Sequence, residues 1–127
     1  MRLRYLLLAL AFALAARDGP GAPALAKRAC HTLDEYTGVV PPGAKAPRLE
    51  NMTADAKAAA KGSSRYAALS SAIAAWAATT SREQALIHNG FKSLTASQSA
   101  ELDALNKVAN AQYAALVAEC EKAKRDQ

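Results

Sequence analysis

Apolar side chains recur every three or four residues in two long segments, which predicts two amphipathic helices. The helix predicted over residues 53–89 has the stripe Tyr66, Leu69, Ile73, Trp76, Thr80 and Ile87. The helix predicted over residues 95–124 has the stripe Leu102, Leu105, Ala109, Tyr113, Leu116 and Cys120. Since only a short turn at Asn89-Gly90 separates the two, we expect an antiparallel hairpin in which each stripe buries the other.

Polar residues mark the expected ends and interruptions of these helices. Thr53 is a candidate N-cap for the first helix, and Thr95 with Gln98 forms a capping box at the start of the second. Two features indicate a break in the first helix. Gly62-Ser63-Ser64 weakens it near residue 62, and a second capping-box pattern over residues 79–84 allows a new start near residue 80.

The segment before these helices predicts less regular structure. Residues 27–37 can form a short helix, and residues 38–52 are expected to be a Pro/Gly linker centred on Pro41-Pro42-Gly43. The predicted fold class is therefore all-α: an antiparallel helical hairpin or a small three-helix bundle.

The N-terminus has the pattern of a secretory signal peptide. Arg2 and Arg4 precede the uncharged run Tyr5–Leu14, and Ala-x-Ala sites follow at residues 13–15 and 24–26. The run is shorter than the roughly twenty residues that span a membrane. We predict a signal peptide over residues 1–26, cleavage after Ala26, a mature domain of residues 27–127 without a transmembrane helix, and a secreted or periplasmic location.

Cys30 and Cys120 are the two cysteines of the chain and lie near the ends of the mature domain. In an oxidising compartment such a pair is expected to form one disulfide. The bridge would staple an alanine-rich domain whose core buries little area per residue. A lipoprotein, acylated at Cys30, is the alternative, but Lys27-Arg28 do not fit the apolar sequence that precedes a lipidated cysteine.

Charge gives the mature domain a mildly basic surface. From residue 27 onward there are 13 Lys and Arg against 10 Asp and Glu, a net charge of +3, which does not by itself indicate nucleic-acid binding. Lys57, Lys61 and Arg65 are spaced by four residues and form a candidate basic interaction face on one helix. Its partner would be an acidic protein or an anionic envelope component.

Candidate chemistry is sparse, and we predict no enzyme activity and no cofactor. His31 and His88 lie outside recognisable catalytic or metal-ligand motifs. His31 with Asp34 and Glu35 could hold a metal ion weakly. We prefer the alternative that these three residues form a solvated helix face. The aromatic residues could line a haem pocket, and a packed core is preferred for them: Tyr36, Tyr66, Trp76 and Tyr113.

Leu94-Thr95-Ala96-Ser97-Gln98 is similar to the LTxxQ pentapeptide of the Spy and CpxP group, small helical periplasmic proteins. Over these five residues the resemblance implies a chaperone or stress-sensing role. The leading hypothesis remains an exported, non-catalytic helical binding protein of the cell envelope or extracellular space. An LTxxQ-like chaperone and a haem or metal carrier are the alternatives.

Overall fold

The computed structural model describes residues 21–38 and 44–125, which are all-helical, as predicted. Four helices follow one another in these residues: α2 (Gly21–Thr37), α3 (Lys45–Gly62), α4 (Ala67–Ile87) and α5 (Ala96–Arg125). Short 3₁₀ turns precede α4 (η1, Ser64–Tyr66) and α5 (η2, Phe91–Ser93). Predictions for residues 1–20 and for Pro41-Pro42-Gly43 lie outside the described residues.

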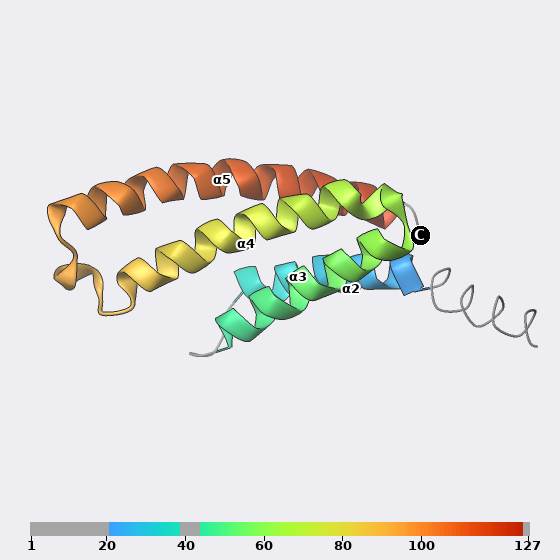
Figure 1. The fold of residues 1–127 in the computed structure, drawn as a ribbon, viewed down its shortest axis with the longest axis horizontal. Helices are drawn as coiled ribbons and strands as arrows, with labels where there is room; N and C mark the ends of the chain where they lie inside the picture. The colour runs from blue at the N-terminus through green and yellow to red at the C-terminus, as the bar shows by residue number, and fades with distance from the viewer. Residues whose placement is uncertain (1–20, 39–43, 126–127) are drawn as a thin grey trace, which may run out of the picture.

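The four helices form two antiparallel hairpins that pack on each other (Figure 1). Helix α2 packs mainly on α3, helix α5 packs mainly on α4, and α3 joins the two hairpins by packing on α4. The predicted hairpin is therefore present as α4 and α5. Figure 1 also shows that α4 and α5 continue well past the end of the α2–α3 hairpin.

Helices α2 and α3 begin earlier than the sequence analysis predicted. The linker expected over residues 38–52 is wrong from Lys45 onward, and the short helix expected from residue 27 begins at Gly21. Pro47 is the third residue of α3, where a backbone N–H has no intrahelical acceptor and proline is tolerated. Thr53 is not an N-cap, because its hydroxyl donates to the Leu49 carbonyl inside α3 (2.8 Å).

The break expected near residue 62 is confirmed, and the one near residue 80 is wrong. Helix α3 ends at Gly62, and Ser63 adopts an extended conformation (φ −156°, ψ 127°) that lets the chain reverse into η1 and α4. Helix α4 then continues unbroken through residue 80. There the Thr79 hydroxyl donates to the Ala75 carbonyl (3.2 Å) and so does not cap a new helix.

The core combines small and aromatic side chains. Alanines on α2 and α3, among them Ala26, Ala29, Ala56 and Ala59, are 0% exposed and let these helices approach closely. Around them lies the aromatic set expected in the core. The Trp76 ring meets Tyr36 edge-on at 5.2 Å and lies 6.0 Å from Tyr113, while Tyr66 is buried and Tyr113 half-buried.

A disulfide joins Cys30 on α2 to Cys120 on α5, as predicted, with the two Cα atoms 5.7 Å apart. It links the first described helix directly to the last across 90 residues of chain. This pairing leaves Cys30 without the thiol that the lipoprotein alternative requires. Among the described residues, none of the helices has both the length and the hydrophobicity needed to cross a membrane.

Candidate binding surface

The part of the α4–α5 hairpin that extends past α2 and α3 has no fully buried residue. On α4 the last buried residue is Ala77, and on α5 the first is Leu116. We call the hairpin between them, residues 78–115, the distal arm, and the rest of the described residues the four-helix base. Figure 1 shows only α4 and α5 side by side along the outer part of the arm, whereas nearer the base α2 still contacts it through the hydrogen bond between Gln84 and Tyr36.

Apolar residues of the distal arm recur at the three- and four-residue spacing of a core-facing stripe, but they are not fully buried. Seven of them are half-buried: Leu86, Ile87, Leu94, Leu102, Leu105, Ala109 and Tyr113. At the tip, Phe91 is 69% exposed, and on α5 Val108 is 47% exposed. The arm therefore exposes two large apolar side chains, Phe91 and Val108, beside a stripe that is only partly buried.

The tip of the arm is locally well ordered by hydrogen bonds. Gly90 has a positive φ of 89° and starts the η2 turn, in which the Ser93 N–H donates to the Gly90 carbonyl (3.2 Å). The predicted capping box is confirmed. The Gln98 N–H donates to the Thr95 hydroxyl (3.1 Å), and the Thr95 N–H donates to Gln98 Oε1 (2.9 Å). This exchange gives the LTxxQ-like residues a structural role at the start of α5.

Gly90→Ala is expected to lower the free energy of unfolding by about 1–2 kcal/mol, because a Cβ strains the left-handed backbone at this turn. No atom lies within 4 Å of the added Cβ, so the cost is conformational. Urea denaturation measures it. Gly21→Ala is the matched control, since its Cβ also meets nothing and alanine favours helix; equal effects of both substitutions would contradict the argument.

Two carboxylates of the arm have opposite electrostatic environments. Glu101 on α5 accepts two hydrogen bonds from the Arg82 guanidinium on α4 (2.7 and 3.1 Å), and these hold its pKa below the ordinary value. Burial raises the pKa of Glu83, whose Oε1 is enclosed and accepts no hydrogen bond in the structure. Beside it, Gln84 Nε2 donates to the Tyr36 hydroxyl (2.8 Å).

Substituting these carboxylates by glutamine should change stability with opposite signs near neutral pH. Because the pKa of Glu83 is raised, its ionised form destabilises the fold, and Glu83→Gln should raise the urea midpoint there. Because the pKa of Glu101 is lowered, its ionised form stabilises the fold, and Glu101→Gln should lower the midpoint.

Both differences should shrink as the pH falls below the ordinary carboxyl pKa of 4.5, where the wild-type side chains become protonated in the unfolded chain. Urea denaturation near neutral pH and at about pH 3 measures both. A shift of the same sign for the two variants at neutral pH would contradict the assignment.

Charge is unevenly divided between the base and the arm. The four-helix base has ten Lys and Arg against six Asp and Glu, whereas the distal arm has three of each. Within the arm, Arg82 and Glu101 also neutralise each other. Contact with the arm is therefore governed by apolar packing, and attraction of an anionic partner would act through the base.

The candidate basic face is only partly assembled on one helix. Lys57 and Lys61 are exposed on α3, but Arg65 lies in η1, after the chain has left the helix at Gly62. The four-residue spacing therefore does not align Arg65 with the lysines, and the prediction of a single helix face is wrong for that residue. Lys57 borders an open groove of about 440 Å³ between α3 and α4, which four alanines help to line.

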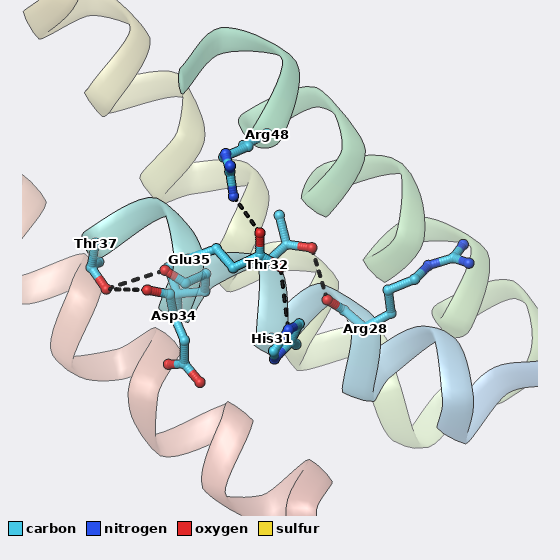
Figure 2. Close-up of polar contacts among 8 residues, drawn as sticks. Arg28, His31, Thr32, Asp34, Glu35, Thr37 and Arg48 are labelled. Atoms are coloured by element: carbon cyan, nitrogen blue, oxygen red, sulfur yellow. Dashed lines mark hydrogen bonds and ion pairs between the residues drawn. The ribbon is translucent and has the colours of Figure 1, made fainter. Parts of the chain in front are cut away.

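The residues considered for weak metal binding are engaged in other contacts. His31 Nε2 lies 3.3 Å from Glu35 Oε1, and Arg48 on α3 bonds the other oxygen of Glu35. Figure 2 shows the Asp34 carboxylate directed away from Glu35. In the residues that the structure covers, no three His, Cys, Asp or Glu side chains gather as a possible metal site.

The remaining candidate residues lie at the surface. His31 and Asp34 line a cavity of about 230 Å³ beside the disulfide, together with Lys27 and Lys124. His88 is exposed at the C-cap of α4, the helix end where it was predicted.

No family model matches the chain, and no curated protein and no solved structure shows significant similarity to it.

Proposed function

We propose that this chain is an exported protein that acts by binding another protein and not by catalysis, with the distal arm as its binding surface. The observation that carries the proposal is that no residue of 78–115 is fully buried, although their apolar residues have core spacing. The disulfide-linked base would hold the arm in place.

The chain itself indicates what kind of partner fits the arm. Towards the base, the same two helices bury Trp76 on α4 and Leu116 on α5 where α2 and α3 pack against them. An amphipathic helical segment of another protein could cover the distal half in the same way. Burial of an aliphatic or aromatic side chain stabilises by about 1.5–3 kcal/mol, so completing the burial of several half-exposed ones would support specific binding.

Export is supported by two independent features. The leader has the charged and apolar regions of a secretory signal. The disulfide is of the kind that persists in oxidising compartments and is rare in the cytosol. We therefore propose a periplasmic or extracellular location for the binding reaction.

Site-specific photocrosslinking in the native envelope or culture fluid tests the proposal. A photoreactive residue at Phe91 should give a discrete adduct with another protein, and the same residue at exposed Ser71 on the base should not. Excess wild-type protein should compete with the adduct, whereas Phe91→Glu, which alters an exposed side chain, should compete poorly. Equal labelling from both positions, or none from Phe91, would contradict binding through the arm.

A chaperone that holds unfolded clients is the second candidate function, favoured by the exposure of Phe91 next to the LTxxQ-like residues at the tip. It predicts that the protein slows aggregation of a denatured client and that Phe91→Glu weakens this effect. A protein with one dedicated partner should leave client aggregation unchanged.

The basic face is a separate prediction with a separate control. If an anionic envelope component binds the base, replacing Lys57, Lys61 and Arg65 by alanine should weaken binding to envelope extract while the Phe91 adduct persists. A triple variant that binds the extract as well as wild type would exclude this contact.

A further inference from the structure

The cavity of about 230 Å³ beside the disulfide is lined by Cys30 but, in the part of the chain that the structure describes, not by Cys120. Both cysteines are otherwise covered, at 4% and 5% exposed. We propose that Cys30 is a thiol-exchange site, at which an anionic small thiol enters the cavity, forms a mixed disulfide with Cys30 and releases Cys120. This inference concerns the four-helix base and does not depend on the binding function proposed for the distal arm.

Charge around the cavity favours a thiol that is itself negatively charged. Lys27 and Lys124 line the cavity from α2 and α5, each one helical turn from the cysteine of its own helix. Asp34 is the acidic residue of the lining, and Glu121 lies 3.4 Å from Lys124 at an exposed position, where water weakens the attraction. The base as a whole has ten Lys and Arg against six Asp and Glu. Such a surface concentrates anionic molecules near it, and cations beside a cysteine favour its thiolate.

Exchange at this site proceeds by two displacements at sulfur. The thiolate of the incoming molecule attacks Cys30 Sγ, a new S–S bond forms, and the bond to Cys120 breaks with its electron pair on Cys120 Sγ, which takes a proton from water. A second thiol then displaces Cys30 from the mixed disulfide. Two external thiols are thereby oxidised to one disulfide, and the disulfide of the protein is reduced to two thiols.

The helix contacts show what this exchange would change. Helix α2 packs mainly on α3 and α5 mainly on α4, so the bond is the direct covalent link between the two hairpins. Because the cavity is present in the folded chain, a thiol can reach Cys30 without prior opening of the base. Small thiols would therefore untie the two hairpins of the folded protein, and the corresponding small disulfide would tie them again by the reverse reaction.

Reaction of the oxidised full-length chain with glutathione, stopped early by excess iodoacetamide, tests which sulfur is attacked. Partly reacted molecules should have glutathione on Cys30 and the carbamidomethyl group on Cys120, which peptide mass mapping distinguishes. The rate should rise in proportion to the glutathione concentration. Glutathione found mainly on Cys120 would overturn the proposal. A rate that levels off at the unfolding rate of the oxidised protein would also overturn it, because the bond would then be reached only after opening.

Charge reversal at the cavity has a matched control on the arm. Lys27→Glu with Lys124→Glu should slow the reaction of glutathione, whose net charge is negative, on the order of tenfold. The same variant should not slow the reaction of cysteamine, whose ammonium group is positive. Lys92→Glu with Lys107→Glu makes the same change in net charge at exposed arm positions. It should alter the glutathione rate by less than about twofold, because salt screens charges at that distance. Equal slowing by both pairs of substitutions would overturn the role of the cavity.

Discussion

Trp76→Ala should be the most destabilising single truncation in this protein, lowering the free energy of unfolding by about 3–5 kcal/mol. Trp76 is 6% exposed on α4 and contacts Tyr36 on α2 and Tyr113 on α5. Its removal would leave a cavity where three helices meet. Several of the other core residues are alanines, whose short side chains cannot move in to fill the space.

Urea denaturation followed by far-ultraviolet circular dichroism measures this effect, because Trp76 is the single tryptophan and its fluorescence is lost in the variant. Trp76→Phe retains an aromatic ring and should lose less stability, which keeps the test informative if the alanine variant does not fold. Phe91→Ala, at an exposed position, is the control and should change stability by about 0.5 kcal/mol or less. Similar losses at the two sites would contradict the assigned core.

The α4–α5 hairpin could be predicted because its signals are local. Bulky residues at three- and four-residue spacing identified one apolar stripe on each helix. These stripes include Ile73 on α4 and Leu116 on α5, both 0% exposed in the structure. The Thr95 capping box and the turn at Gly90 fixed the boundary between the helices. These signals depend on neighbouring residues only, so a single sequence reveals them.

The α2–α3 hairpin was predicted only in part: helix was expected over residues 27–37 and from residue 53, but the start of α3 at Lys45 and the pairing of the two helices were missed because their signals are weak or ambiguous. Alanines occupy every face of the segment that follows Thr53, so the buried positions Ala56 and Ala59 have no apolar contrast with their exposed neighbours. Pro47 was assigned to a non-helical linker, although it occupies the first turn of α3. A proline two residues inside a possible helix start was the signal that could have found the start of this helix.

The distal arm could not be predicted because an amphipathic stripe shows which residues favour burial and not whether a neighbour reaches them. Helix lengths held the available clue. Helix α5 has 30 residues, or about 45 Å, whereas α2 has 17, or about 26 Å. Leu102 and Leu105 therefore lie on a part of the α5 stripe that extends beyond the shorter helices packed against it. Their incomplete burial follows from this difference in helix length.

The disulfide should contribute the largest stabilisation that one covalent bond provides here, on the order of 4 kcal/mol in the chain-entropy model for a loop of 90 residues. The contact pattern gives the bond a specific role, because α2 packs mainly on α3 and α5 mainly on α4. The bond between Cys30 and Cys120 ties the two hairpins together directly. Cys30→Ala with Cys120→Ala should therefore lower the urea midpoint strongly.

Hydrogen exchange should locate this loss. Without the bond, amides of α2 are expected to exchange much faster than those at the α4–α5 contact around Ile73 and Leu116, because opening the α2–α3 hairpin no longer requires moving α5. Reducing agent should weaken wild type to the level of the double variant and leave the double variant unchanged. A wild-type midpoint unaffected by reduction would contradict this role.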